Sequence, residues 1–250
     1  MVKGILFDKD GTLIDFYEVW GTAAGPVMDR LLADCHMGER EILKRELLER
    51  LGIHGSSIDP EGAFAFMTYQ EITGIIWNFL KKVHPERLPE KQAFLTQVQN
   101  EFYREVVEKR TDYPVFTDVR NLFQTLTEAY HLHVGLATTD TLSSAKACLD
   151  CMKASEYVTF WGTDDGVMPV KPDGKLIELA ADAWQISPEE ILMVGDTPND
   201  MRFAHNGRAF ALGTLSGTGC RKDMETLADD LIESVAELPA WLDRYKERDK

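Results

Sequence analysis

Short apolar runs alternate with helical patterns at the start and over the second half of the chain, and this alternation limits the fold more than any other feature. Apolar runs of this kind are typical of strands that are buried on both faces of a parallel sheet. The predicted strands are residues 2–7, 131–138, 157–162, 191–195 and 208–213. Helical patterns separate the last four of them. This spacing predicts an α/β fold with a doubly wound parallel sheet.

The stretch from residue 16 to residue 111 has a different character. It shows no convincing strand, and helical patterns fill most of it on both sides of the turn-rich segment 52–62. In segment 39–52 the predicted apolar face of a helix consists of Ile42, Leu43, Leu47, Leu48 and Leu51. We therefore predict an all-helical cap domain at 16–111, inserted into an α/β core domain made of residues 1–15 and 112–250.

The acidic composition limits the partners of the protein. The 250 residues include 42 Asp and Glu against 27 Lys and Arg, which gives a formal net charge of -15. This charge disfavours nucleic acids and anionic membrane surfaces as partners. The apolar run at the N-terminus is too short for a signal peptide, and no later run approaches the roughly 18 residues that span a bilayer. We expect a cytoplasmic protein, and its oligomeric state is not indicated.

Two acidic residues stand at the end of the first predicted strand, in the sequence DKDGTL. Asp8 follows the strand directly and Asp10 comes two residues later. Both carboxylates can therefore reach one metal ion or one reacting group as the chain leaves the strand. Gly11 permits the sharp turn that this exit needs.

Further polar residues occupy corresponding places in the second half of the chain. Thr138 ends a predicted strand, where a hydroxyl points into the crevice in which open α/β sheets bind ligands. Lys171 lies just before a helical pattern, in VKPDGK. Asp196 follows the strand 191–195 in GDTPND, and Asp200 comes about one helical turn later, where it can face the same metal ion. Taken alone, Thr138 is explained by the preference of threonine for strands, and Lys171 is explained as an ordinary solvated lysine.

The four motifs together resemble the signature of the phosphatases of the haloacid dehalogenase-like superfamily. The order is DKDGTL, a threonine that ends a strand, Lys-Pro, and GDTPND. The resemblance covers about residues 1–15 and 112–215, and the helical insertion lies where that family has its helical cap. Across the core the chain is most similar to phosphoglycolate phosphatases. The resemblance implies magnesium-dependent hydrolysis of a small phosphomonoester, such as 2-phosphoglycolate, through an aspartyl-phosphate.

The resemblance also implies a role for each motif residue. Asp8 would attack phosphorus, and Asp10 would protonate the leaving alcohol and then take a proton from water. The expected catalytic residues are Asp8, Asp10, Thr138 and Lys171. The expected substrate contacts are Thr138, Thr139, Lys171 and His54. The expected magnesium ligands are Asp8, Asp10 through its backbone carbonyl, Asp196 and Asp200, the last directly or by orienting other ligands.

Several alternatives stay open at this point. Val170 and Gly174 depart from the family's pattern around the motif lysine, so Lys175 competes with Lys171 for its role, although Lys-Pro favours Lys171. His54 lies in segment 52–62, which is either a specificity loop of the cap or an ordinary connection. The loop 213–219 (GTLSGTG) is a further candidate for lining the crevice.

The alternatives to a phosphatase are a sugar-phosphate mutase and a non-catalytic binding protein. A sugar-phosphate mutase of the same superfamily also carries an acid at the place of Asp10, but such mutases usually have Thr and His where this chain has Phe16 and Trp20. A non-catalytic binding protein has no physical reason to keep a cluster of mutually repelling carboxylates. The sequence therefore favours a phosphatase that acts on a small phosphorylated metabolite.

Overall fold

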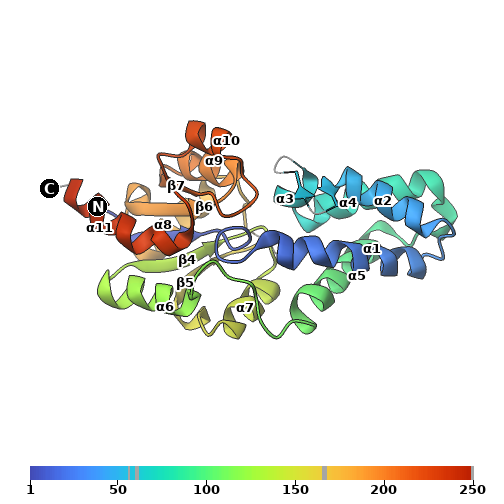
Figure 1. Ribbon diagram of the computed structural model, residues 1–250, viewed down its shortest axis with the longest axis horizontal. Helices are drawn as coiled ribbons and strands as arrows, with labels where there is room; N and C mark the ends of the chain where they lie inside the picture. The colour runs from blue at the N-terminus through green and yellow to red at the C-terminus, as the bar shows by residue number, and fades with distance from the viewer. Residues whose placement is uncertain (56, 60–61, 165–167, 249–250) are drawn as a thin grey trace. The chain divides into compact units, whose positions relative to one another are not determined.

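The computed structural model describes residues 1–250 except 56, 60–61, 165–167 and 249–250 (Figure 1). The chain divides into two compact units, one formed by Met1–Phe16 with Asp112–Lys250 and the other by Tyr17–Thr111. Each unit has its own secondary structure and its own buried residues.

The first unit is built on a sheet of six parallel strands in the order β5-β4-β1-β6-β7-β8. The strands are β1 (Gly4–Phe7), β4 (His133–Ala137), β5 (Val158–Gly162), β6 (Ile191–Gly195), β7 (Phe210–Thr214) and β8 (Asp230–Ile232). Every residue of β1 and of β6 is buried, as expected for central strands of a parallel sheet. The predicted α/β fold is confirmed, with one edge strand, β8, that the sequence did not predict.

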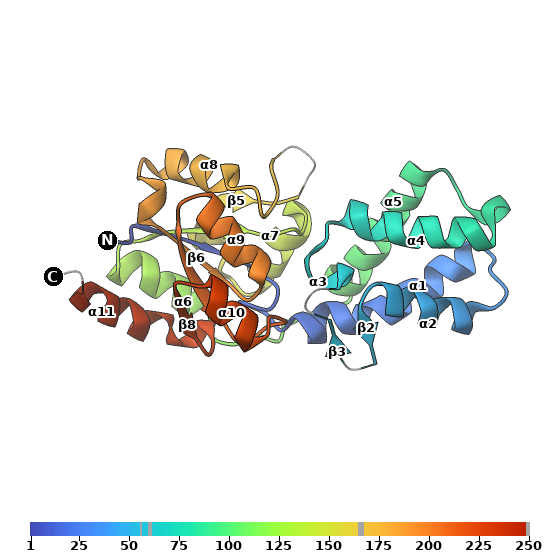
Figure 2. The ribbon, with the colours of Figure 1, turned by 90° about the horizontal axis from the view of Figure 1, so that it is seen from above.

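Helices cover both faces of this sheet (Figures 1 and 2). They are α6 (Val119–Gln124), α7 (Leu142–Cys151), α8 (Lys175–Trp184), α9 (Pro198–Asn206), α10 (Arg221–Leu227) and α11 (Leu238–Arg248). On one face α8 and α9 bury Ile177 and Phe203 in the same cluster as Leu6 and Met193 of the central strands. On the other face Phe7 packs on Phe123 of α6, with ring centroids 5.2 Å apart. The sheet is therefore doubly wound.

The direction in which the chain crosses the sheet reverses between β1 and β6. From β1 the chain continues to β4 and β5 on one side, whereas β6 leads to β7 and β8 on the other. At such a switch point the two following connections diverge and leave a crevice beyond the carboxyl ends of the strands. Ligands of open α/β sheets bind in this crevice, so the residues that follow β1 and β6 are candidates for a binding site.

The second unit consists mainly of helices. They are α1 (Thr22–Asp34), α2 (Arg40–Arg50), α3 (Ala63–Phe66), α4 (Tyr69–Val83) and α5 (Lys91–Tyr103), and short irregular turns extend α1 and α5. Thr68 begins α4 with a capping box, in which its hydroxyl accepts from the amide of Glu71. Trp20 packs on Phe102 of α5, with ring centroids 5.9 Å apart, which supports a packing role for this aromatic residue.

Two details of this unit differ from the prediction. The strands β2 (Ile53–His54) and β3 (Ser57–Ile58) pair as a short antiparallel ribbon, so the unit is not all-helical. Two-residue strands leave no periodicity in a sequence, which is why they were missed. In α2, Leu43, Leu47 and Leu51 are buried, whereas Ile42 is 48% exposed. The buried stripe is therefore narrower than predicted.

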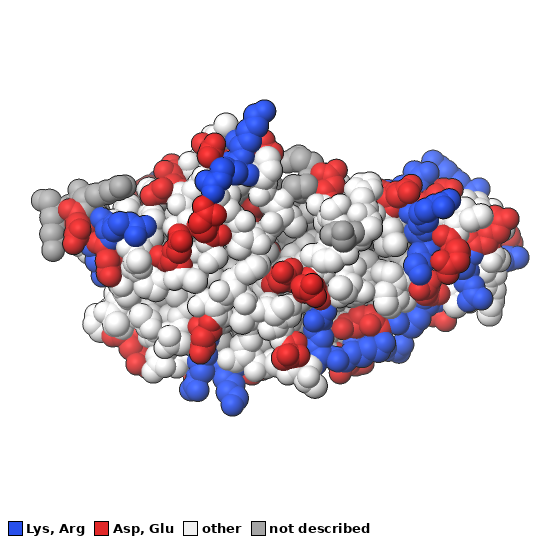
Figure 3. All heavy atoms as spheres, in the orientation of Figure 1, with Lys and Arg blue, Asp and Glu red and all other residues white. Residues whose placement is uncertain are grey.

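The surface carries charged side chains of both signs (Figure 3). Acidic and basic side chains are interspersed on the face drawn in Figure 3. Among the described residues, none of the helices combines the length and the apolar character needed to cross a bilayer.

Candidate active site

Asp8 and Asp196 lie directly after β1 and β6, at the switch point of the sheet. The register pairs Phe7 with Val194, and the Asp8 amide donates to the carbonyl of Val194 over 2.9 Å. The two apolar strands therefore end side by side, and each delivers an aspartate as its chain enters the crevice. The position of both acids follows from where the apolar runs stop.

Asp200 joins these two residues from the first turn of α9. One carboxylate oxygen from each of Asp8, Asp196 and Asp200 lies within 4.8 Å of the others, and all three residues are buried. Thr197 begins α9 with a capping box, and its amide and hydroxyl donate to Oδ2 of Asp200 over 3.0 Å and 2.6 Å. This cap turns Asp200 back toward the ends of the strands. Three of the four predicted magnesium ligands are thus brought together from two separate parts of the chain.

The side chain of Lys171 bridges two of the acids. Its Nζ is 2.7 Å from Oδ1 of Asp8 and 2.6 Å from Oδ1 of Asp200. Burial lowers the pKa of Lys171, but the carboxylates of Asp200 and Asp8 more than offset this and hold the pKa above its usual range. Lys171 is therefore an ammonium group at neutral pH.

Lys175, the competing lysine, makes its ion pair with Glu178 and not with the acidic cluster. Lys175 lies on the first turn of α8, where its Nζ is 2.7 Å from Oε2 of Glu178, and its side chain is 56% exposed. Lys171 and Lys175 are thus only four residues apart in the sequence, but the first side chain is buried and the second is exposed. The structure brings Lys171, and not Lys175, to the acidic cluster.

The carboxyl groups of the cluster have unusual acid strengths. Burial raises the pKa of Asp8 well above its usual range; Lys171 opposes this shift, and Asp200 and Asp196 add to it. Burial and the neighbouring Asp200 also raise the pKa of Asp196 to about 7. Three buried carboxylates beside one ammonium repel one another unless more positive charge is supplied. A set of oxygen donors of this kind fits a hard divalent cation such as Mg²⁺.

The groups that orient Asp196 were not predicted from the sequence. The hydroxyl of Thr12 donates to Oδ1 over 3.1 Å, and the amide of Thr218 donates to Oδ2 over 2.9 Å. A Cβ atom at Gly217 would lie 2.0 Å from Oδ2 of Asp196, so only glycine lets the loop approach this closely. The only signal in the sequence was the loop 213–219, which was expected to line the crevice without a stated contact.

The other predicted residues of the core lie at the same edge of the sheet or next to it. Thr138 follows β4, which pairs with β1, and it is buried. Its hydroxyl oxygen accepts from the amide of Asp140 over 3.2 Å. Thr139 is half-buried beside it, and Asp10 is half-buried after β1. The structure thus places the two threonines and Asp10 on the loops that follow adjacent strands.

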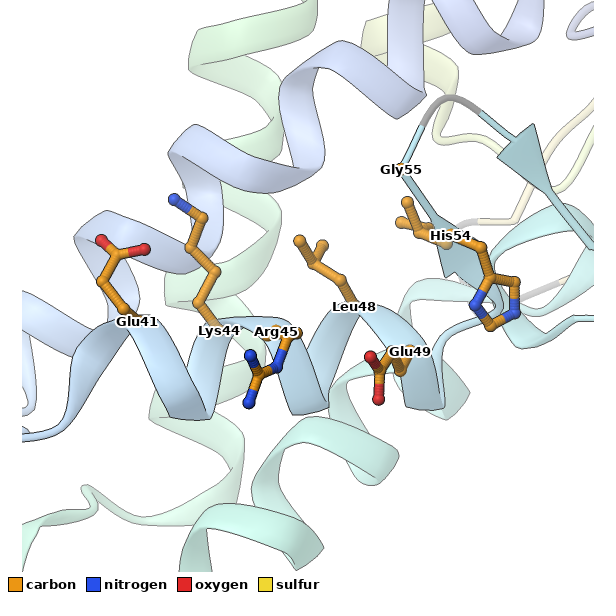
Figure 4. A pocket seen from close by; sticks show the side chains of 8 residues that line it. Glu41, Lys44, Arg45, Leu48, Glu49, His54 and Gly55 are labelled. Carbon is orange, nitrogen blue, oxygen red and sulfur yellow. The ribbon is translucent and has the colours of Figure 1, made fainter.

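His54 belongs to the second unit and lies in the ribbon strand β2. Together with α2 it lines a hollow of about 440 Å³, and Figure 4 shows how the side chains surround it. The lining residues are Glu41, Lys44, Arg45, Leu48, Glu49, Ile53, His54 and Gly55. His54 is exposed, and its role as a substrate contact stays a prediction.

Comparison with known proteins adds independent information. The chain is 24% identical over 241 residues to the phosphoglycolate phosphatase of Shigella boydii serotype 4, covering 95% of this chain and 91% of that protein. Its fold is similar to that of a predicted phosphoglycolate phosphatase from Haemophilus somnus 129pt, with a TM-score of 0.69, 16% identity and coverage of 96% and 98% of the two chains. It is also similar to that of a β-phosphoglucomutase from Clostridium difficile, with a TM-score of 0.68, 15% identity and 99% coverage of both chains.

The two structural similarities show the fold alone, because sequence identity with these structures is low. The family itself is shown by a different comparison. A family model for haloacid dehalogenase-like hydrolases matches residues 2–208, which include all four motifs around the acidic cluster. The chain therefore belongs to the family of haloacid dehalogenase-like hydrolases.

Proposed function

We propose that the protein is a magnesium-dependent phosphatase that hydrolyses a small phosphomonoester through an aspartyl-phosphate on Asp8. The observation that carries the proposal is the contact of the buried Lys171 with both Asp8 and Asp200 at the switch point of the sheet. An anionic nucleophile attacks an anionic phosphate only where positive charge offsets their repulsion. The lysine supplies part of that charge at the nucleophile itself.

The proposed first step is the attack of Asp8 on phosphorus. Since Lys171 contacts Oδ1 of Asp8, we expect Oδ2 to form the new bond to phosphorus while the bond from phosphorus to the ester oxygen breaks. Asp10 gives its proton to the departing oxygen, and Thr138 and Thr139 bind the transferred phosphoryl group. In the second step a water molecule attacks phosphorus and returns its proton to Asp10, and Asp8 leaves as a carboxylate.

A magnesium ion would be held by Asp8, Asp196, Asp200 and the backbone carbonyl of Asp10. When bound, it supplies the positive charge that lowers the repulsion between the acids and the phosphate. The proposal is supported by the chemistry of the donors, because carboxylate oxygens are the ligands that Mg²⁺ prefers. The contacts from Thr12 and Thr218 hold Asp196 in the orientation found in the cluster.

Magnesium is expected to stabilise the protein more strongly at pH 8 than at pH 6. The raised pKa of Asp196, about 7, means that the metal-free folded protein holds its proton more tightly than the unfolded chain does. The contribution of Asp196 to metal-free stability therefore falls as the pH rises from about 4 through 7, whereas Mg²⁺ binds the deprotonated acids. At a concentration of about 100 times Kd, we expect Tm to rise by roughly 5–10 °C at pH 8.

Thermal unfolding with and without Mg²⁺ at the two pH values measures this effect. Asp196→Asn should lose the response, whereas Asp182→Asn, which changes an exposed acid on α8, should keep it. An equal shift in Tm at both pH values would contradict the proposed ligand set.

The expected substrate class is a small acidic phosphomonoester, and 2-phosphoglycolate is the first candidate. The proposal rests on the similarity to phosphoglycolate phosphatases across 95% of the chain. In a panel of phosphate esters with Mg²⁺, kcat/KM for 2-phosphoglycolate should exceed that for sugar phosphates and nucleotides by at least about tenfold. A preference for a sugar phosphate or a nucleotide would contradict this substrate. A cytoplasmic location stays a prediction.

Product analysis in the same assay distinguishes a phosphatase from a mutase. A phosphatase releases inorganic phosphate, whereas a mutase returns the phosphoryl group to a second position of the sugar. Phe16 and Trp20, which replace the Thr and His of such mutases, support the phosphatase. An isomeric sugar phosphate formed without free phosphate would favour the mutase.

A further inference from the structure

Lys9, between the two acids of DKDGTL, is a fully buried lysine that the proposed mechanism does not use. Its side chain is 1% exposed, and its Nζ is 2.9 Å from Oδ1 and 2.8 Å from Oδ2 of Asp10. The same Nζ is 3.2 Å from Oδ2 of Asp140. The ammonium group thus contacts both oxygens of one carboxylate and one oxygen of a second.

Asp140 is fixed in turn to the loop after β4. It is 3% exposed, and its Oδ1 accepts from the amide of Thr141 over 2.7 Å. Its own amide donates to the hydroxyl oxygen of Thr138 over 3.2 Å, and its carbonyl accepts from the amide of Asp164 over 2.9 Å. Lys9 therefore connects the loop that carries Asp10 to the loop that carries Thr138.

Packing alone does not explain a lysine at this position. An apolar side chain of similar volume fills a buried site without the cost of desolvating a charge, and replacing buried ion pairs in this way is often neutral or stabilising. The carboxylates of Asp10 and Asp140, at 2.8 Å and 3.2 Å from Nζ, offset the cost of burying the ammonium group. The lysine remains charged, and that charge acts on Asp10.

We propose that Lys9 and Asp140 are positioning residues, which hold the carboxyl group of Asp10 in the orientation from which, once protonated, it gives its proton to the leaving group. A carboxylate whose two oxygens contact one fixed ammonium group has lost most of its rotational freedom before the substrate arrives. Proton transfer requires this alignment, because the acid must lie within hydrogen-bond reach of the departing oxygen. The inference rests on the proposed function, in which Asp10 is the acid.

The test compares two aryl phosphates that differ in their need for a proton. Phenyl phosphate releases a strongly basic phenolate and depends on the acid, whereas the nitro group of p-nitrophenyl phosphate stabilises its leaving anion. The quantity measured is kcat/KM, which reports the steps up to departure of the leaving group. In Lys9→Met we expect the ratio of kcat/KM for phenyl phosphate to that for p-nitrophenyl phosphate to fall about tenfold.

Further variants separate positioning from a general loss of structure. Lys9→Met leaves Asp140 without its ammonium partner, so Lys9→Met with Asp140→Asn removes the charges together and should show the same fall in ratio. If neither variant folds, Asp140→Asn alone, which leaves Lys9 beside Asp10, is the deciding variant. The same ratio of kcat/KM values should fall in it if Asp140 helps to position Asp10. In an Asp10→Asn background the change at Lys9 should have no further effect on the ratio. Lys175→Met, at an exposed lysine, is the matched control and should keep the wild-type ratio.

The outcomes distinguish this inference from the function on which it rests. Equal losses on both substrates, or an unchanged ratio in folded variants, would overturn the positioning role while the phosphatase proposal stands. A wild-type protein that hydrolyses neither substrate with Mg²⁺ would overturn both. A fall in ratio that disappears in the Asp10→Asn background supports the inference.

Discussion

Asp8→Asn is expected to abolish hydrolysis of p-nitrophenyl phosphate, with kcat lowered by about 10⁴-fold or more. The amide is a far weaker nucleophile than the carboxylate, so the aspartyl-phosphate does not form and the reaction loses its two-step path. Wild-type protein that is quenched in acid during turnover should carry phosphate on Asp8, which mass spectrometry of its peptides detects. The variant should carry none.

Loss of activity in this variant should not come with loss of structure. Burial raises the pKa of Asp8, so its ionised form costs stability at neutral pH in the metal-free protein, and the substitution removes that cost. Lys171 keeps its contact with Asp200. We therefore expect metal-free Asp8→Asn to have a Tm at least as high as that of the wild type. Asp182→Asn is the matched control, and residual activity above one hundredth of the wild-type rate would rule out Asp8 as the nucleophile.

The sequence predicted the sheet and the acids at its edge for one physical reason. Strands that are buried on both faces are apolar along their whole length, so the first polar residue marks the carboxyl end of the strand. Asp8 and Asp196 are such residues, and in the structure they lie at the switch point between β1 and β6. Asp200 was predicted from the spacing of one helical turn, which the capping box of α9 preserves.

Features that depend on distant parts of the chain were not predicted from residue patterns. Thr218 reaches Asp196 from a loop 22 residues further on, and no local pattern records that contact. The edge strand β8 has three residues and begins with Asp230, too short for a periodic signal. The burial of Lys9 was equally hidden, because a lysine between two aspartates in a sequence is typical of an exposed turn.

The choice between Lys171 and Lys175 shows where family resemblance and structure each contribute. The residues around VKPDGK left both lysines open, and only the match to Lys-Pro favoured the first. The structure separates them by contact and exposure: one is buried between two carboxylates and the other pairs with Glu178 in solvent. Methionine keeps most of the side-chain volume of lysine. We therefore expect a large loss of activity and stability when it replaces Lys171, and almost no change when it replaces Lys175.

Lys171→Met is expected to lower kcat by roughly 10²–10³-fold, because the nucleophile loses the charge that offsets its repulsion by phosphate. The same change leaves Asp8 and Asp200 buried without their ammonium partner, and breaking a buried ion pair from one side costs about 3–5 kcal/mol of folding free energy. Urea unfolding of the metal-free protein measures this loss. Mg²⁺ should restore part of the stability, because a cation in the acidic cluster replaces some of the missing charge.

Lys175→Met should change kcat by less than about twofold and the free energy of unfolding by less than about 0.5 kcal/mol, as is usual for exposed residues. Its ion pair with Glu178 is exposed on both sides and is screened by solvent. The two lysines thus test one physical statement: an ammonium group matters here because it is buried against the nucleophile. If Lys175→Met abolished turnover and Lys171→Met did not, the charge that acts on the phosphate would come from α8, and the site described around Asp8 would not be the catalytic one.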